Sequence, residues 1–209
     1  MTHVVEPEPA IAERLFGARI DLARQYAANL GAHGEERGLI GPLEPPRLWS
    51  RHILNCAVLA PVFTTGTVGD VGSGAGLPGL VIAIARPDLE VALIEPMERR
   101  CDWLNEQIEE LGLTNAKVYR GRAQEVPLQE SLDYVTARAV SALKTLIPLV
   151  APLVRPGGEI VVMKGANAER EIDEAAKQIR KFSLSNVHVI TLGEGMLDDP
   201  TRAVQAKVE

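Results

Sequence analysis

The segment most informative about chemistry is the glycine-rich stretch at residues 70–79, with the sequence DVGSGAGLPG. It follows β-forming residues at 67–71 and precedes an apolar run at 79–85, which predicts a strand, a turn and a helix. In an open parallel sheet this turn lies at the carboxyl ends of the strands, where glycines let the backbone approach a ligand. Leu77 stands where a dinucleotide-binding motif needs its third glycine, so a different small ligand is indicated. A purely structural turn is the alternative.

Two charged residues follow the strands next to this turn. Glu95 ends the predicted strand at 90–94, and a carboxylate there can accept hydrogen bonds from both hydroxyls of a ribose. An ordinary strand-end carboxylate is the other interpretation. Arg138 follows the predicted strand at 134–137, where a charge is costly unless it is paired. We therefore expect Arg138 to contact a ligand.

The scaffold that positions these residues is predicted by alternating strand and helix patterns. This α/β alternation implies crossover connections and a mainly parallel sheet covered on both faces. The last two strands are joined by residues 193–201 without a helical pattern, so they are expected to pair as an antiparallel hairpin. The predicted strands are 67–71, 90–94, 116–119, 134–137, 159–163, 187–191 and 203–207, and the predicted helices are 79–85, 97–111, 142–153 and 168–182.

The first part of the chain has helical patterns only. Apolar residues recur every three or four positions from Ile11 to Tyr26, with Gly31 as the expected stop, and a second helix is predicted at 47–59. A turn-rich stretch at 33–46 separates them. We expect one domain over residues 1–209, made of an N-terminal helical extension at 1–66 and a core at 67–209.

Composition narrows the possible partners and compartments. The formal net charge of −6 argues against nonspecific coating of nucleic acid, so an RNA partner would need a local basic patch. The apolar runs are too short to span a bilayer, and residues 1–9 carry acidic residues and prolines where a secretory signal needs a cationic start. We therefore expect a cytoplasmic protein without a membrane partner. Cys56 and Cys101 lack the nearby partners of a zinc site, so we expect reduced thiols, no metal and no catalytic cysteine.

The order of these elements resembles the class I S-adenosylmethionine-dependent methyltransferases. Their Rossmann-like fold has seven strands, a terminal antiparallel hairpin and a D-x-G-x-G-x-G motif after the first strand, and a turn like that at 155–158 precedes their fifth strand. The resemblance implies S-adenosyl-L-methionine as the cofactor. It also implies a cofactor site made of Asp70, Gly72, Gly74, Gly76, Leu77, Glu95, Ala123, Gln124 and Arg138.

Further motifs resemble one family, the ribosomal RNA small subunit methyltransferase G family, also called the glucose-inhibited division protein B family. They are WSRHILN at 49–55, IEPMERR at 94–100, RAQE at 122–125, ARAV at 137–140 and MKG at 163–165, with a weaker match at Arg202. The resemblance implies methyl transfer to N7 of a guanine in the 530 loop of 16S rRNA, within the small ribosomal subunit or an assembly intermediate. Cys56 and Gln124 depart from the residues common in this family, and the C-terminus is less basic.

The expected reaction fits what the sequence lacks. The segment after the fourth strand has neither the motif used to methylate exocyclic amines nor a cysteine that could attack a pyrimidine carbon. Guanine N7 has a free lone pair and no proton to lose, so its methylation needs positioning and desolvation more than a general base. We assign catalytic roles to Arg138 and His52. We assign RNA contacts to Arg51, His52, Arg122, Lys164 and Arg202.

Several interpretations stay open at this point. His52 could be an ordinary helix histidine, Trp49 a core anchor or a platform for a base, and Arg122 and Arg202 plain surface charges. The whole chain could instead methylate a small molecule or a protein, or it could bind S-adenosylmethionine without catalysis. We expect a monomer.

Overall fold

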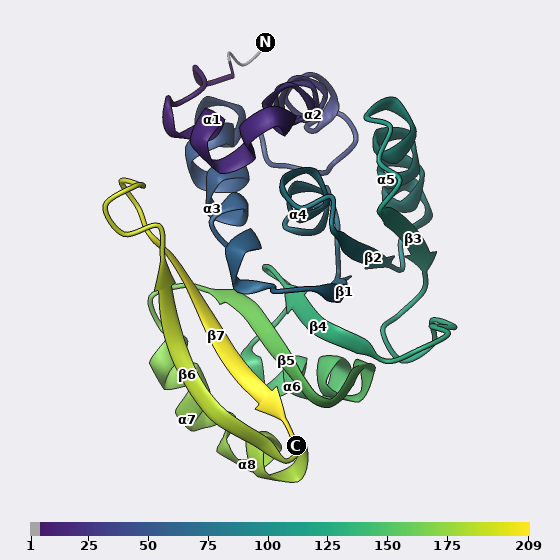
Figure 1. Ribbon diagram of the computed structural model, residues 1–209, viewed down its shortest axis with the longest axis vertical. Helices are drawn as coiled ribbons and strands as arrows, with labels where there is room; N and C mark the ends of the chain where they lie inside the picture. Colours follow the sequence, from purple (N-terminus) through teal and green to yellow (C-terminus); the bar gives the residue numbers. More distant parts are fainter. Residues whose placement is uncertain (1–4) are drawn as a thin grey trace.

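A single seven-stranded sheet organises the protein (Figure 1). The computed structural model describes residues 5–209; residues 1–4, part of the predicted N-terminal extension and of the acidic start, lie outside the described residues. The strand order is β3-β2-β1-β4-β5-β7-β6, with β1 to β5 parallel and β7 antiparallel to both of its neighbours. The strands are β1 (Gly66–Val71), β2 (Leu89–Glu95), β3 (Ala116–Arg120), β4 (Leu132–Ala137), β5 (Val154–Lys164), β6 (Leu184–Leu192) and β7 (Thr201–Val208).

All seven predicted strands and the terminal hairpin are confirmed, and the fifth strand is longer than predicted. The turn expected at residues 155–158 lies inside β5, whose pairing with β4 is irregular between Leu132 and Tyr134. Gly157 has a φ of 80°, and a side chain on Gly158 would come within 2.6 Å of the Asp133 carbonyl oxygen. These glycines therefore make an irregular first part of the strand rather than a separate turn.

Helices cover both faces of the sheet (Figure 1). One face carries the N-terminal helices together with α4 and α5, and the other carries α6, α7 and α8. Each face has its own cluster of buried apolar side chains. The α-helices are α1 (Ile11–Phe16), α2 (Ile20–His33), α3 (Leu54–Ala57), α4 (Gly79–Ala85), α5 (Glu98–Glu110), α6 (Leu143–Val150), α7 (Ala168–Glu174) and α8 (Ala176–Lys181). Short 3-10 segments occur at Gly17–Arg19, Pro45–Arg47, Ala60–Val62 and Ala151–Leu153, and a π-helical segment at Leu48–Ile53.

Three helix predictions were wrong in detail. Gly31 does not end its helix, because α2 continues to His33 and Gly31 instead leaves room for the side chain of Val5. The helix predicted at 47–59 is a series of 3-10, π and α segments, in which the amide of Ser50 donates to the Glu6 carboxylate. The helix predicted at 168–182 is interrupted at Ala175, which is fully buried.

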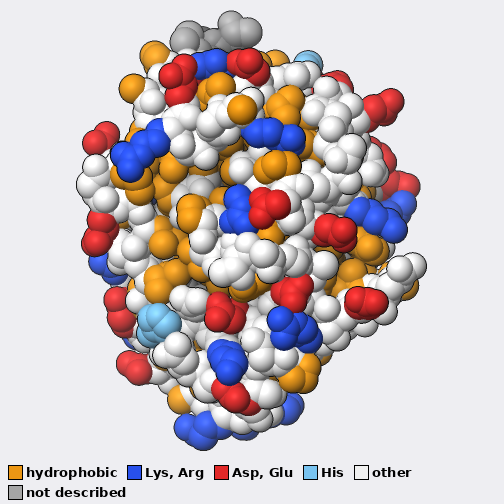
Figure 2. All heavy atoms as spheres, viewed as in Figure 1, with side chains coloured by type: hydrophobic (Ala, Val, Ile, Leu, Met, Phe, Trp, Pro, Cys, Tyr) orange, Lys and Arg blue, Asp and Glu red, His pale blue; other side chains and the backbone are white. Residues whose placement is uncertain are grey.

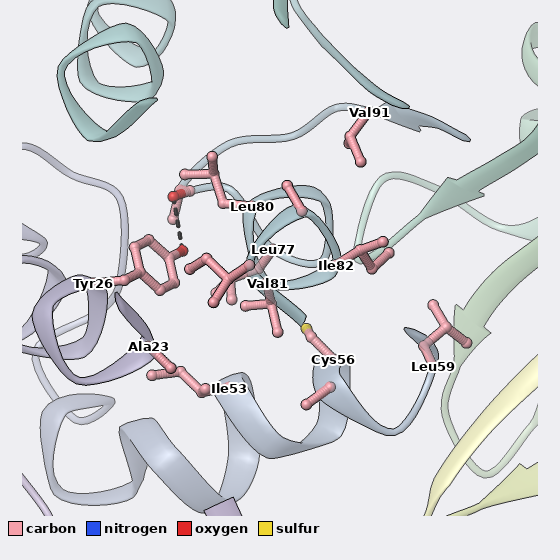
Figure 3. Close-up of a cluster of buried hydrophobic side chains, with 14 of the residues drawn as sticks. Ala23, Tyr26, Ile53, Cys56, Leu59, Leu77, Leu80, Val81, Ile82 and Val91 are labelled. Atoms are coloured by element: carbon pink, nitrogen blue, oxygen red, sulfur yellow. Dashed lines mark hydrogen bonds between the residues drawn. The ribbon is translucent and has the colours of Figure 1, made fainter. Parts of the chain in front are cut away.

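The N-terminal helices are bonded to the glycine-rich turn of the core. Figure 3 shows Tyr26 reaching from α2 toward this turn, beside Leu77 and Leu80. The Tyr26 hydroxyl donates to the carbonyl oxygen of Ala75 at 3.0 Å, and Trp103 Nε1 of α5 donates to the same oxygen at 2.8 Å. One continuous cluster of buried side chains contains residues of the extension and of the core.

Asp70, the penultimate residue of β1, is a fully buried carboxyl group. One carboxylate oxygen accepts the backbone N–H of Gly79, the first residue of α4, at 2.9 Å, while the other has no partner within the described residues. Burial is the main cause that raises the pKa of Asp70 to about 7, and the charge of Glu95 adds to the increase.

The shared core predicts that the extension and the sheet unfold together. Trp49 lies in the extension and Trp103 in α5, and both are buried in the same cluster. In a Trp103→Phe variant, Trp49 fluorescence and far-UV circular dichroism should therefore give the same urea midpoint. A Trp49→Phe variant should show the same agreement for Trp103. Loss of the Trp49 signal at lower urea than the loss of dichroism would contradict a single cooperative unit.

The raised pKa of Asp70 predicts a stability that falls as the pH rises. Carboxyl groups of unfolded chains titrate near pH 3.9, so between about pH 4 and about pH 7 the folded state binds more protons here than the unfolded state. This group should lower the free energy of unfolding by up to about 1.4 kcal/mol per pH unit over that window. Asp70→Asn keeps an oxygen for Gly79 and removes the titration. Urea unfolding at several pH values should show that the free energy of unfolding of the wild type falls relative to that of the variant up to about pH 7. The same pH dependence of this free energy in both proteins would refute the prediction.

Candidate functional site

The glycine-rich turn begins where β1 ends. Gly72, Gly74 and Gly76 all have positive φ values, of 74°, 55° and 104°, which L residues with side chains rarely adopt. A side chain on Gly72 would also meet Val140, at 2.7 Å. Alternating glycines thus let the chain fold back over the end of the strand, as the sequence predicts.

Glu95 lies against this turn. Its side chain is 2% exposed and accepts the backbone N–H groups of Gly74 at 2.9 Å and Met97 at 3.0 Å, while Arg100 Nη1 lies 3.9 Å away. The loop after β3 joins the same corner, because Gly121 donates its N–H to the Glu95 carbonyl oxygen at 3.1 Å. Of the two predicted loop residues, Ala123 is buried and Gln124 is exposed.

Both cysteines contact residues of the candidate site. Cys101 donates from Sγ to the Glu95 carbonyl oxygen at 3.1 Å, and Cys56 Sγ lies 3.4 Å from Arg138 Nη1. Both thiols are free and buried, and burial is the main cause that raises the pKa of each. A protonated, buried thiol is a poor nucleophile.

An open cleft of about 820 Å³ adjoins the turn through Val140, which lines the cleft and lies against Gly72. The residues of the turn and Glu95 do not line it. Its walls come from the π-helical segment, the loops after β4 and β5, and the start of β7. It brings together four predicted site residues, Arg51, Arg138, Lys164 and Arg202, and also contains two carboxylates, those of Glu171 and Asp199. Arg122 is exposed on the loop after β3 and does not line this cleft.

Arg138 is held by groups without a negative charge. Its Nη2 donates to His52 Nδ1 at 2.7 Å and to the Arg51 carbonyl oxygen at 3.3 Å, and its Nη1 contacts the thiol of Cys56. Across residues 5–209 its hydrogen-bond partners include no carboxylate. The guanidinium is therefore oriented at the cleft while its positive charge stays available to an anionic ligand.

His52 lies behind Arg138, with both ring nitrogens engaged. Its Nε2 is 2.5 Å from Glu44 Oε2, and its side chain is 12% exposed. Burial is the main cause that lowers the pKa of His52, followed by the charge of Arg138. The imidazole is therefore neutral near pH 7 and accepts a hydrogen bond at Nδ1. The motif predicts the importance of His52, whereas no local signal identifies Glu44.

Lys164 is tied into the wall of the cleft. Its Nζ donates to Glu171 Oε2 at 2.8 Å and to the Ser141 carbonyl oxygen at 2.7 Å, and only 8% of its side chain is exposed. Glu171 also accepts the backbone N–H of Leu143 at 2.7 Å. Burial raises the pKa of Glu171, but the bonds from Lys164 and Leu143 outweigh it and the net shift is downward. This geometry makes Lys164 a support of the loop after β4, and Glu171 is a second residue that sequence reasoning missed.

The remaining predicted RNA contacts differ in position. Arg202 is 44% exposed near Glu169, at 3.8 Å, and Arg51 is 51% exposed near Asp199, at 3.7 Å. Trp49 is buried in the core cluster, which favours the anchor interpretation over a base platform. On the face shown in Figure 2, acidic and basic side chains are interspersed and form no continuous basic surface.

Residues 5–209 also lack the features of two other kinds of site. They contain no group of three or more His, Cys, Asp or Glu side chains arranged to hold a metal ion. None of their helices has the length and apolarity required to cross a membrane.

Solved structures share this architecture. A methyltransferase from Pyrococcus furiosus superposes with a TM-score of 0.60 at 16% identity, covering 88% of this chain and 98% of the other. The N-methyltransferase NodS from Bradyrhizobium japonicum WM9, solved with S-adenosyl-l-homocysteine, gives 0.56 at 15% identity, covering 83% and 95%. The fold is that of the class I S-adenosylmethionine-dependent methyltransferases.

Sequence comparisons are more specific. Proteins named ribosomal RNA small subunit methyltransferase G from Leifsonia xyli subsp. xyli and Clavibacter michiganensis subsp. michiganensis are each 62% identical to this chain. The first alignment covers 100% of both chains, and the second covers 98% of this chain and 97% of the relative. The family model described as rRNA small subunit methyltransferase G matches residues 19–199. With its motifs and its fold in agreement, this chain belongs to the rRNA small subunit methyltransferase G family.

Proposed function

We propose that this protein transfers a methyl group from S-adenosylmethionine to N7 of a guanine in 16S rRNA, in the 530 loop. The observation that carries the proposal is the cationic cleft beside the glycine-rich turn. Four cations and two carboxylates line it, in a protein whose formal net charge is −6. Such a cleft concentrates an anionic acceptor at one place, whereas the whole surface does not attract nucleic acid.

The residues around the turn fit S-adenosylmethionine. Three glycines with positive φ open the backbone, and Glu95 offers a buried carboxylate at the end of the neighbouring strand. The carboxylate can accept hydrogen bonds from ribose hydroxyls, and the loop with Ala123 and Gln124 lies next to the same corner. S-adenosylmethionine supplies an electrophilic methyl group there.

The cleft suits an acceptor whose methylation requires no general base. The thiols of Cys56 and Cys101 are buried, and His52 has both ring nitrogens occupied. Guanine N7 attacks with its own lone pair, so the protein has to orient the base and exclude water. The role we propose for Arg138 is to fix the RNA phosphate or the base next to the turn.

The best-supported substrate is an RNA loop held in the small ribosomal subunit or in an assembly intermediate. Unstacking a base costs a few kcal/mol and is easiest where the base is already unpaired. We propose that a monomer acts in the cytoplasm, with Arg51 and Arg202 at the rim contacting phosphates. Arg122 lies on the loop after β3, two strands away from β1 and outside the cleft, and is proposed to contact a more distant part of the RNA.

Two other functions would give different experimental results. A methyltransferase for a small molecule or a protein would methylate free nucleosides or proteins without ribosomal particles, and a binding module would bind cofactor without transfer. The deciding experiment is mass mapping of 16S rRNA from cells with and without the gene, followed by methylation of the deficient subunits by the purified protein. A 16S rRNA that is identical in both strains would reject the proposal.

Cofactor binding should depend on Glu95. Glu95→Ala should weaken binding of S-adenosylhomocysteine by about 1 to 3 kcal/mol, because ribose hydroxyls lose their acceptor. Calorimetry measures this, with NAD as a ligand that should not bind. Glu98→Ala, which removes an exposed carboxylate paired with Arg120, is the control and should bind normally. Normal binding by Glu95→Ala would exclude the ribose role.

Arg138 and Arg202 should affect different steps. Arg138→Ala should lower single-turnover methylation by at least about 100-fold through loss of positioning. Arg202→Ala should keep cofactor binding, raise the KM for subunits and reduce the salt dependence of binding by about one unit of slope. Both variants are compared by calorimetry and by methylation of deficient subunits over a salt series. Wild-type turnover by Arg138→Ala would show that the cleft is not the acceptor site.

A further inference from the structure

The contacts of Arg138 form a chain of three side chains from separate parts of the sequence. Glu44 precedes the Pro45–Arg47 segment, His52 lies in the π-helical segment, and Arg138 follows β4. Glu44 Oε2 lies 2.5 Å from His52 Nε2, and His52 Nδ1 lies 2.7 Å from Arg138 Nη2. Since a guanidinium can only donate, Nδ1 must accept and the ring proton must be on Nε2, where the carboxylate accepts it.

We propose that Glu44 is a positioning residue, which fixes the Nε2–H form of His52 so that the neutral ring holds Arg138 at the acceptor cleft. The role of the cleft in methyl transfer rests on the proposed function, but the chain of contacts does not. The imidazole separates the carboxylate from the guanidinium. Arg138 is thereby oriented through Glu44 without a direct ion pair that would cancel its charge.

The charges around the ring make this arrangement sensitive to acid. Glu44, which is also bonded to Arg47, faces the ring from the loop side, Arg51 acts from the same π-helical segment, and Arg138 from the end of β4. A proton added at Nδ1 would replace the acceptor with a donor and place two cations in contact. Burial and Arg138 lower the pKa of His52 from 6.5, whereas Glu44 opposes the shift. We therefore expect the hydrogen bond from Arg138 to His52 to be lost only below about pH 6.5.

The first test observes the ring without measuring activity. Long-range ¹⁵N–¹H NMR of the full chain without cofactor gives the tautomer and pKa of each histidine, and comparison with His52→Asn assigns His52 among the four histidines. We expect a protonated Nε2, an unprotonated Nδ1 and a pKa below 6.5. In Glu44→Ala the ¹⁵N shifts should move toward a mixture of tautomers. A protonated Nδ1, or wild-type shifts in Glu44→Ala, would overturn the proposal.

The second test measures kcat for subunits lacking the methyl group, over a range from about pH 5.5 to about pH 8.5 that includes the usual histidine pKa. Wild-type kcat should fall in acid with the midpoint found by NMR, and Glu44→Ala should lower kcat about tenfold at pH 7.5, as loss of an orienting partner does. In His52→Asn the amide oxygen can take the place of Nδ1 and does not titrate. This variant should be more active than His52→Leu and should lack that acid limb.

A matched control separates this role from general effects. His33 and Glu36 form an exposed histidine–carboxylate pair at 3.1 Å, away from the cleft, so Glu36→Ala should leave kcat and its pH profile unchanged. Equal activity of His52→Asn and His52→Leu, or wild-type kcat in Glu44→Ala, would refute the positioning role. If the wild type methylates no 16S rRNA, the proposed function fails, while the NMR result still decides whether Glu44 sets the tautomer.

Discussion

The carbonyl oxygen of Ala75 accepts hydrogen bonds from two helices, and the geometry of the site depends on this one atom. Three alternating glycines give the turn its shape, but they also leave the backbone free to adopt many others. Tyr26 and Trp103 restrict that freedom by donating to the same oxygen at 3.0 Å and 2.8 Å. Both donors are buried, so neither bond competes with water. The N-terminal extension is thus part of the mechanism that shapes the turn.

The loop after β4 is held by two different kinds of contact. Lys164 and Glu171 meet as opposite charges and fix the loop after β4 through the carbonyl of Ser141 and the amide of Leu143. Arg138, on the same loop, is fixed by carbonyl oxygens and an imidazole. Lys164 therefore has its charge neutralised within the protein, whereas Arg138 keeps its charge for a ligand. Two cations that look equivalent in the sequence have different capacities because their partners differ.

Periodicity and motif spacing predict the seven strands, the hairpin and the turn, because these follow from local patterns. The same spacing places Glu95 and Arg138 at strand ends, where the structure has them. Glu44 and Glu171 could not be predicted. Their partners His52 and Lys164 lie only eight and seven positions away, but no motif marks either pair. Both pairs gain their roles from the loop after β4, which only folding brings next to them. The π-helical segment could not be predicted either, because the carboxylate of Glu6 binds its backbone from far along the chain. The bond of Lys164 to Glu171 has no signal in the sequence either, so the RNA contact predicted for Lys164 takes no account of it.

The pairing of β5 with β7 places Lys164 directly opposite Arg202. Like charges opposite one another on antiparallel strands are unfavourable, and here each cation has its own carboxylate, Glu171 at 2.8 Å from Lys164 and Glu169 at 3.8 Å from Arg202. A neutral β-former at position 202 would pair better with β5. Substitutions at this pair that raise the melting temperature would therefore remove charge from the surface that we propose contacts RNA, which is a trade-off between stability and activity.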